Sequence, residues 1–464
     1  MAGMVGPYSM DGVTMPTWLI RFDKNGQCTS PETRAALLDR LGTAAYSDIV
    51  FFSHGWNNDF DDATRLYASF LRSWESLAAA HPPARPAQPL FVGVLWPSIW
   101  LSFDSGPAIA GGAGGAARPD AATEALIEAL DAAGATAEPL RRARELLARP
   151  SLGQAEAAEL AALVAPAFGA AHDDEGSGAN RDTSVRDLLF MLASMQQAAV
   201  GAAAPVAVDD WGESPEQVAA GNEPLAPGQA IQSAGWLSAL DPRQALRLFS
   251  VYRMKDRAGT VGTQGVAPLL RDVMQASAAR ATPLHAVGHS YGCKVMLSAI
   301  CAPPPLPRPV QSLLLLQPAL SHLAFADEVP GAGRPGGYRL ALDPARVRGP
   351  IYSTYSRKDT PLHTTFHLAL RRESDLGEAQ IAAGQEPSTS AGRPPSRFAA
   401  LGGYGPRRAG QRLVDPIPAA GTAYPAAPAG TPILAFDGSQ GLISSHGDVT
   451  SATAAWALHQ LMFR

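Results

Sequence analysis

Short apolar runs alternate with segments of helical spacing along most of the chain. Apolar runs that predict buried strands occur at 17–23, 48–55, 91–98, 283–290, 310–318, 349–359 and 431–438. Apolar residues recur at helical intervals between and after these runs, at 31–41, 62–80, 292–300 and 448–461. This alternation is typical of an α/β protein whose mostly parallel central sheet carries helices on both faces.

Two long stretches interrupt this alternation. Residues 101–240 begin with a glycine-rich segment and continue with alanine-rich helical patterns near 121–133, 137–149, 154–164 and 184–199. Residues 373–430 are rich in glycine, proline, alanine and arginine, and they predict a long irregular loop. We expect both to be insertions above the carboxyl ends of the strands, where open α/β sheets bind ligands. The core would then consist of 1–100, 241–372 and 431–464.

The longer insertion is expected to form a mobile helical lid. Some of its apolar residues fall on one helical stripe that must pack against another surface: Leu188, Leu189, Met191, Leu192 and Met195. Glycine-containing segments at 106–115 and 172–180 are suited to act as hinges. A rigid structural cap is the alternative.

Composition narrows the class of protein. The chain has 464 residues, of which 46% are hydrophobic, as expected for a globular protein with a sizeable core. The formal net charge of −5 provides no basic surface for nucleic acid or for an acidic membrane. The three cysteines, Cys28, Cys293 and Cys301, are not clustered, which favours a reducing compartment over a disulfide framework or a zinc site.

No segment has the pattern of a secretory signal or a membrane span. The first residues lack a basic region followed by an apolar core. The longest apolar runs, such as 313–316, are too short to cross a bilayer. A cytoplasmic location is therefore expected, with export by a signal-independent route left open. The oligomeric state has no signal in the sequence.

The strongest chemical signal is the pentapeptide GHSYG at 288–292, which lies between a predicted strand and a predicted helix. A very sharp strand-to-helix turn needs glycine at Gly288 and Gly292, because a side chain at either position would collide with its neighbours. Such a turn lifts a hydroxyl out of the sheet. Ser290 is therefore the candidate nucleophile.

A second polar segment, HGWNN at 54–58, also follows an apolar strand. Gly55 allows a tight turn that exposes the Trp56 amide. That amide and the Tyr291 amide, directly after the nucleophile, are the expected oxyanion donors. His54 and Asn57 would support this loop. The alternative is a polar turn that contains a buried histidine.

The acid and the base of the predicted site lie further along the chain. Asp359 follows the strand-like run IYSTYSRK, with Asp327 and Asp343 as competitors and a turn or N-cap role as the alternative. His446 lies in a Ser/Gly loop before the last helical segment, and a surface histidine is its alternative. The order serine, aspartate, histidine is the one expected when this triad is built on an α/β-hydrolase sheet.

The segments HGWNNDFDDA, LWPS, GHSYG, TYSRKD and SHGDV together resemble the α/β-hydrolase superfamily, in particular a group of largely uncharacterised bacterial α/β hydrolases. The resemblance covers 17–100, 260–372 and 431–464. It implies an α/β-hydrolase core, a catalytic triad at Ser290, Asp359 and His446, and hydrolysis of an ester-like bond without a cofactor. The two insertions depart from the resemblance, in the regions that normally determine the substrate.

Other motifs carry less weight. His363 and His367 are spaced for one helix face, but no H-E-x-x-H glutamate accompanies them, so no metal is expected. The glycines of 111–115 lack the strand, the spacing and the lysine of a phosphate-binding loop. Cys293 is expected to pack in the core rather than to serve as a second nucleophile.

From these residues we expect a serine hydrolase that acts on a small or lipid-like ester, as a carboxylesterase or lipase does, through an acyl-enzyme. The alanine- and leucine-rich insertion favours an apolar acyl group. Amidase, thioesterase or acyltransferase chemistry would use the same residues. A non-catalytic scaffold that binds a protein partner through the insertions is the alternative from another class. Neither the acyl and alcohol groups nor the physiological role has a signal in the sequence.

Overall fold

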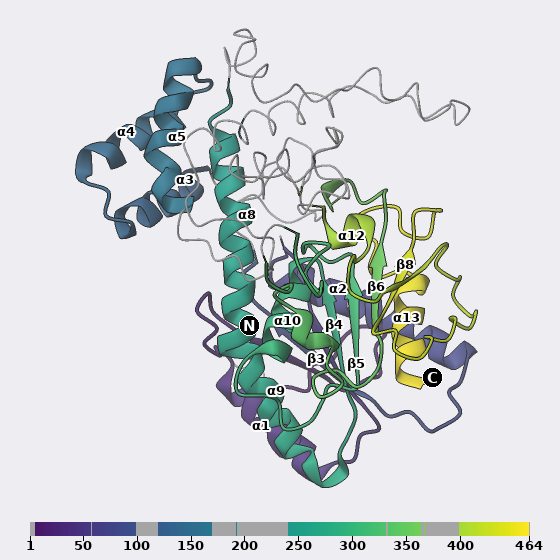
Figure 1. Cartoon of the computed structure of the whole chain (residues 1–464). Coiled ribbons are helices and arrows are strands. Elements are labelled where there is room, and N and C mark those ends of the chain that lie inside the picture. The colour runs from purple at the N-terminus through teal and green to yellow at the C-terminus, as the bar shows by residue number, and fades with distance from the viewer. Residues whose placement is uncertain are drawn as a thin grey trace, which may run out of the picture.

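The computed structural model describes residues 5–56, 58–98, 119–168, 192, 240–330, 333–362, 366 and 399–463. In these ranges, eight strands form one sheet in the order β1-β3-β2-β4-β5-β6-β8-β7, and each adjacent pair is parallel (Figure 1). The predicted α/β class is confirmed. The strands are β1 (Thr17–Arg21), β2 (Ile49–Ser53), β3 (Leu90–Leu95), β4 (Leu284–His289), β5 (Ser312–Leu316), β6 (Ile351–Tyr355), β7 (Arg412–Val414) and β8 (Ile433–Asp437).

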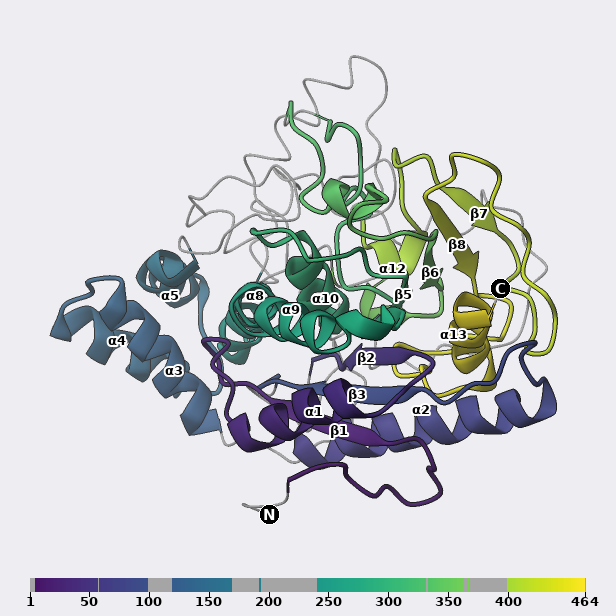
Figure 2. The ribbon, with the colours of Figure 1, turned by 90° about the horizontal axis from the view of Figure 1, so that it is seen from below.

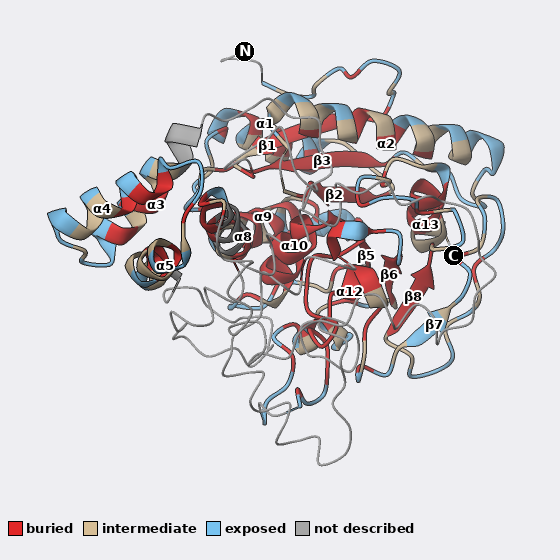
Figure 3. Ribbon diagram, turned by 90° about the horizontal axis from the view of Figure 1, so that it is seen from above, coloured by how far each residue is buried: buried red, intermediate tan, exposed pale blue. Residues whose placement is uncertain are grey.

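Helices cover both faces of the sheet (Figure 2). Alternate residues of a strand point to opposite faces, so Ile49 and Phe51 pack with one set of helices while Val50 and Phe52 pack with the other. The first set is α1 (Pro31–Thr43), α8 (Arg243–Thr260), α9 (Ala267–Ala276) and α10 (Tyr291–Cys301). The second set is α2 (Phe60–Ala80) and α13 (Ala452–Phe463). Figure 3 shows that the central strands and α10 are buried along their length.

A π-helical segment, η3 (Val261–Val266), joins α8 to α9 and lies against α10. Its two glycines allow two close approaches, that of Gly262 to α10 and that of Gly265 to the loop after β1. A Cβ on Gly262 would lie 2.5 Å from the Val295 carbonyl oxygen, and one on Gly265 would lie 2.7 Å from the Gly26 carbonyl oxygen. Helix α10, which begins beside Ser290, is therefore held between the sheet and η3.

The insertion between β3 and α8 contributes three described helices, α3 (Pro119–Ala132), α4 (Ala137–Leu147) and α5 (Gln154–Phe168). They match three of the four predicted helical patterns. The fourth pattern, apart from Leu192, and both expected hinges lie outside the described residues. The three helices pack around buried leucines and against α8.

The position of this helical unit follows from α8. Near the carboxyl end of α8, the Arg257 guanidinium donates to the Pro97 carbonyl 2.6 Å away, just beyond β3. From Arg257 back to Arg243, the helix extends about 20 Å at 1.5 Å per residue. Helices α3–α5 lie at that far end of α8 (Figure 1). The unit is therefore displaced from the sheet toward the side of the strands' carboxyl ends.

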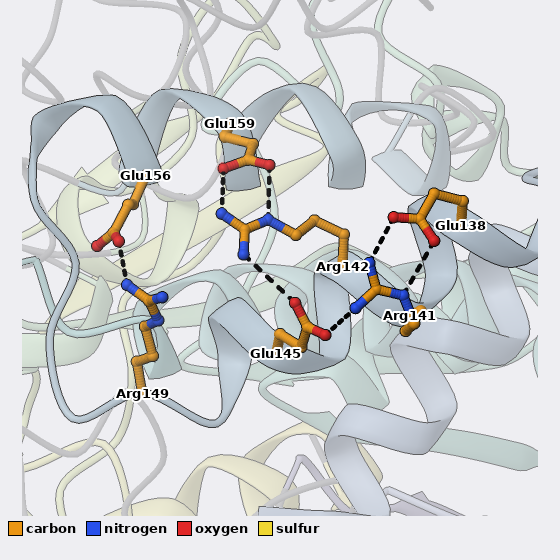
Figure 4. Close-up of polar contacts among 7 residues, drawn as sticks. All are labelled: Glu138, Arg141, Arg142, Glu145, Arg149, Glu156 and Glu159. Carbon is orange, nitrogen blue, oxygen red and sulfur yellow. Dashed lines mark hydrogen bonds and ion pairs between the residues drawn. The ribbon is translucent and has the colours of Figure 1, made fainter.

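Charged side chains link α4 and α5 on the outside of the unit (Figure 4). Arg142 forms a two-pronged pair with Glu159 at 2.7 Å and also contacts Glu145. Arg141 pairs with Glu138 and Glu145. Exposed pairs of this kind contribute little to stability, because water and salt screen them. Buried leucines, rather than these ion pairs, are the main source of the unit's stability.

Two short elements lie in the region 373–430, for which the sequence predicts an irregular loop. In its described part, 399–430, the chain forms the short helix α12 (Leu401–Tyr404) and the edge strand β7. Strand β7 pairs in parallel with β8 through Arg412, Leu413 and Val414. Part of the predicted loop therefore belongs to the core sheet.

At the amino ends of the strands, a polar cluster borders a cavity of about 400 Å³. Asp48, which is fully buried, accepts two hydrogen bonds from Arg85, at 2.6 and 2.9 Å. His285 lies 3.1 Å from the same carboxylate through Nε2 and 2.7 Å from Ser312 through Nδ1. Burial raises the pKa of Asp48, but the hydrogen bonds from His285 and Arg85 outweigh it, so the pKa is lowered.

Asp48→Asn is therefore expected to lower the free energy of unfolding by about 2–4 kcal/mol at neutral pH. Because the pKa of Asp48 is lower in the folded protein than the value near 3.9 of the unfolded chain, its ionised form contributes its full stability above that unfolded value. This contribution to the free energy of unfolding is lost as the pH falls through the folded pKa. The gap between wild type and variant should consequently narrow in acid. Urea unfolding at neutral and acidic pH measures it, with Asp39→Asn on the exposed side of α1 as control. A gap that is the same at both pH values would contradict the assignment.

No helix in the described ranges is both long enough and apolar enough to cross a membrane.

Candidate active site

Ser290 lies in the sharp turn that the sequence predicts, directly between β4 and α10. Its backbone has φ 55° and ψ −124°, a conformation that costs a non-glycine residue about 1–3 kcal/mol. A Cβ on Gly288 would lie 2.6 Å from the Cys293 Cα, and one on Gly292 would overlap the Ser53 carbonyl oxygen. Both glycines are therefore required by close backbone contacts around Ser290.

The three predicted triad residues meet at the carboxyl edge of the sheet. His446 Nε2 lies 2.8 Å from Ser290 Oγ, and His446 Nδ1 lies 2.8 Å from Asp359 Oδ2. Ser290 follows β4, Asp359 follows β6, and His446 follows β8. All three are buried. Residues far apart in the sequence thus form one continuous chain of hydrogen bonds.

The direction of these hydrogen bonds follows from the groups involved. An ionised carboxylate only accepts, so His446 Nδ1 carries the proton that is donated to Asp359. In the neutral imidazole, Nε2 then accepts the hydrogen bond from the Ser290 hydroxyl. The imidazole is therefore oriented to remove the proton of Ser290.

Asp359 is held in place by its own turn. Its Oδ1 accepts from the Leu362 amide at 3.1 Å, and its amide donates to the Ser356 carbonyl at 3.1 Å. The two competing aspartates lie elsewhere and are exposed. Asp327 pairs with Arg339 at 2.6 Å, and Asp343 accepts from the Ala345 amide at 2.8 Å.

The two expected oxyanion donors flank Ser290. A Cβ on Gly55 would lie 2.7 Å from the Ser290 Cβ, so the turn after β2 is in close contact with the nucleophile. Trp56 follows Gly55, and Tyr291 is the first residue of α10. The amino end of a helix is positive and favours negative charge nearby. The turn after β2 and the amino end of α10 therefore both lie next to Ser290.

His54 stabilises this turn as a neutral side chain. Burial lowers its pKa to about 4, despite the opposing hydrogen bond to Gly55. Its Nδ1 donates to the Gly55 carbonyl at 2.9 Å, and its Nε2 accepts from the Trp96 amide at 3.3 Å. The Trp96 indole donates back to the His54 carbonyl at 3.0 Å. His54 therefore fixes the path of the backbone next to Ser290 rather than carrying charge.

Two further residues that the sequence reasoning did not single out complete this turn. Asn58 donates through its amide side chain to the Gly55 and Trp56 carbonyls at 3.3 and 3.0 Å. The Ser98 hydroxyl accepts a hydrogen bond from the backbone amide of Asn58 at 3.1 Å. Trp96 and Ser98, the second and fourth residues of the LWPS segment, make these hydrogen bonds. The segment at the end of β3 thus stabilises the turn after β2. Asn57 lies outside the described residues.

Three other residues missed at the level of sequence donate to the loop that carries His446. His289 Nε2 lies 2.9 Å from the His446 carbonyl oxygen. Gln317 Nε2 lies 2.8 Å from the Ser445 carbonyl and 3.1 Å from the His446 carbonyl. Ser356 Oγ donates to the Ile443 carbonyl at 2.9 Å. Their common signal is position, because each lies where an apolar strand ends.

The cluster at the amino ends of the strands contains the same three residue types, Asp48, His285 and Ser312, but in a different setting. Ser312 begins β5 and lies within the sheet instead of on a strand-to-helix turn. Its hydroxyl is buried at the opposite edge from Ser290. The two clusters therefore share residue types but differ in the backbone setting of the serine.

Of the remaining candidates, only Cys293 lies within the described residues. Burial raises the pKa of the Cys293 thiol well above its usual value, and its Sγ lies 3.8 Å from the Leu316 carbonyl, as expected for a packed thiol. His363, His367 and the glycines of 111–115 lie outside the described residues. Within the described ranges, no group of histidine, cysteine, aspartate and glutamate is arranged to hold a metal ion.

Comparisons with models of protein families, with curated proteins and with solved structures find no significant match to this chain. The likeness of its motifs to the α/β hydrolases therefore stays a prediction. What the site can do follows from the contacts among Ser290, His446 and Asp359.

Proposed function

We propose that this chain is a serine hydrolase that cleaves an ester-type bond, as a carboxylesterase or lipase does. The observation that carries the proposal is the position of His446, whose two ring nitrogens lie 2.8 Å from Ser290 Oγ and 2.8 Å from Asp359 Oδ2. A nucleophile, a base and a group that orients the base are the parts that acyl transfer requires. The turn at Ser290 presents the first of them in a strained conformation.

The proposed reaction uses these atoms in two halves. Ser290 Oγ attacks the carbonyl carbon while its proton passes to His446 Nε2, and Asp359 stabilises the resulting imidazolium. The oxyanion accepts hydrogen bonds from the Trp56 and Tyr291 amides. As the carbon–oxygen bond breaks, His446 returns the proton to the departing alcohol. Water then attacks the acyl-enzyme with His446 as base, which releases the acid and restores Ser290.

The proposed fold is that of an α/β hydrolase. All the strand pairings in the described sheet are parallel, and the three residues follow β4, β6 and β8 at one edge. Helices α3–α5 are the described part of the expected lid. Their displacement toward the carboxyl edge supports a role above the site, and their alanine and leucine content favours an apolar acyl group.

A fluorophosphonate probe tests the proposal directly, because it labels a serine only when a base activates it. We expect one label per chain, at Ser290. Ser312→Ala is the matched control, since it removes the serine of the amino-edge cluster and should leave labelling intact. A well-folded wild-type protein that takes no label would favour the non-catalytic scaffold instead.

A substrate series then separates the chemistries that share this triad. p-Nitrophenyl esters from acetate to palmitate, set beside a thioester, an anilide and a phospholipid, should give the highest kcat/KM for an acyl ester. Faster turnover of the anilide or the thioester would keep the serine hydrolase and change the bond. Acyl transfer to an added alcohol in place of water would identify an acyltransferase.

A further inference from the structure

The loop that carries His446 is tied to three neighbouring strands by one side chain from each. His289 is the last residue of β4, while Gln317 and Ser356 directly follow β5 and β6. The strands β4, β5 and β6 are adjacent in the sheet. Their three side chains donate to carbonyl oxygens between Ile443 and His446. The sheet thus presents a row of donors to one short piece of loop.

The loop has little regular structure of its own. Its backbone hydrogen bonds are local turns, such as Ile443 N to Gly438 O at 2.9 Å and Asp448 N to Ser445 O at 3.2 Å. No helix or strand includes His446. The position of the imidazole relative to the sheet therefore depends strongly on side chains that reach the loop from outside it.

His289 links the loop to the nucleophile itself, because it precedes Ser290 in the chain. Its Nε2 must carry a proton, since a carbonyl oxygen only accepts. Burial and the neighbouring His446 lower the pKa of His289 to about 3, so the ring stays neutral and keeps this single donor. Its ring centroid lies 5.0 Å from that of His446. Within the described residues, its Nδ1 has no hydrogen-bond partner, so the ring's one hydrogen bond there is to the His446 carbonyl.

Gln317 combines its contacts to the loop with an unusual backbone conformation. It is buried and has φ 41°, in the left-handed region that few non-glycine residues occupy. Its backbone amide donates a hydrogen bond to the Thr354 hydroxyl at 3.1 Å. Its side chain uses one nitrogen to reach both the Ser445 and the His446 carbonyls. Strained residues of this kind cluster at functional sites, where the surrounding structure holds them.

We propose that His289 and Gln317 are positioning residues, which together hold the His446 carbonyl and thereby keep the imidazole in reach of both Ser290 and Asp359. Ser356 anchors the beginning of the same loop segment at Ile443. This inference rests on the proposed hydrolase function, because it assigns a task within the same site. Two donors on one carbonyl oxygen fix both its distance from the sheet and the orientation of its peptide group. With a single donor, the peptide group could still rotate about that one hydrogen bond.

The expected effect is on chemistry, not on substrate binding. His289→Leu removes the Nε2 donor of the imidazole, and Gln317→Met removes the Nε2 donor of the amide. Each variant places an apolar side chain of similar size in the same position. We expect kcat to fall by about 10²-fold, the loss typical of a catalytic group displaced by about 1 Å, with KM changed by no more than roughly twofold. His289→Gln retains an amide donor near the former Nε2 and should recover most of the activity, to within roughly fivefold of wild type.

His285 provides a matched control. It lies on the same strand β4, is buried, and makes two side-chain hydrogen bonds, but at the opposite edge of the sheet. His285→Leu should lower the thermal midpoint while leaving the rate of Ser290 labelling in the folded protein unchanged. Loss of a buried histidine from β4 is thereby separated from loss of the contact to His446.

A spectroscopic readout reports the position of His446 without turnover. The proton between His446 Nδ1 and Asp359, which lie 2.8 Å apart, should give a strongly deshielded signal in the one-dimensional proton spectrum. We expect this signal to broaden or disappear in His289→Leu and Gln317→Met, and to persist in His289→Gln and His285→Leu. All spectra are recorded below the thermal midpoint of each variant.

The outcomes distinguish the two levels of inference. If wild type takes no fluorophosphonate label, the hydrolase function fails. If wild type is labelled and both His289→Leu and Gln317→Met react at the wild-type rate with the deshielded proton intact, the positioning role fails while the function stands. If His289→Leu does not fold, Gln317→Met alone decides. Slow labelling with an unchanged proton signal would also overturn the positioning role.

Discussion

Ser290→Ala is expected to lose at least about 10³-fold in ester turnover, and up to about 10⁶-fold, while the protein stays folded. The substitution deletes one hydroxyl at the surface of the reaction centre and leaves the apolar core unchanged. His446→Ala should lose a similar factor, because the nucleophile and its base act as one unit. The double variant should then be little worse than either single one. Initial rates on a p-nitrophenyl ester measure all three.

Two controls accompany this result. Thermal unfolding should place the midpoint of Ser290→Ala close to that of wild type, since no cavity is created. Ser312→Ala should retain the wild-type rate, because that serine lies at the amino edge of the sheet. A folded Ser290→Ala protein with normal turnover would exclude the proposed nucleophile. Additive losses in the double variant would mean that Ser290 and His446 do not share one step.

Asp359→Asn is expected to lower kcat by about 10⁴-fold. The carboxylate accepts the Nδ1 proton of His446 at 2.8 Å, which leaves Nε2 free to take the proton of Ser290. An amide in the same place can donate to Nδ1 and so favour the tautomer with its proton on Nε2. That tautomer cannot accept from the serine. The fold should tolerate the change, because the Leu362 amide can still bond to the carbonyl of the new side chain.

Asp327→Asn and Asp343→Asn are the matched controls. Both residues are exposed and bond to groups away from His446, so both variants should keep the wild-type rate. If one of them is as damaging as Asp359→Asn is expected to be, the triad acid is misassigned although the class of enzyme is not. Labelling with fluorophosphonate should be slow in Asp359→Asn but still confined to Ser290.

Most of the sheet could be predicted because its strands are buried on both faces. Such strands appear as continuous apolar runs, as in Ile49–Ser53 and Ser312–Leu316, and these need no knowledge of their neighbours. Strand β7 could not be found this way. It has three residues, two of them exposed, and it exists only because β8 supplies a partner. The helices of 243–276 were not predicted either, and the glycines of η3 interrupt the apolar periodicity where α8 meets α9.

The contacts among Ser290, His446 and Asp359 could be anticipated because each of these residues follows a recognisable strand or turn. The residues that hold the triad could not. His289 lies within the GHSYG segment, yet its task depends on which carbonyl of a distant loop reaches it. Gln317 became notable only once β5 was known to lie between β4 and β6. Contacts to backbone atoms of an irregular loop leave no pattern in the sequence.

The strand order also bears on how the chain folds as it is synthesised. β3 lies between β1 and β2, and β8 lies between β6 and β7, so on each flank a later strand inserts between two earlier ones. Until β8 emerges from the ribosome, β7 lacks the neighbour it has in the finished sheet, and its pairing is delayed. His446 follows β8 closely, so the strand that completes this flank also brings the imidazole of His446 to Ser290. A nascent chain therefore carries Ser290 without this contact for as long as it takes to synthesise the residues between the two.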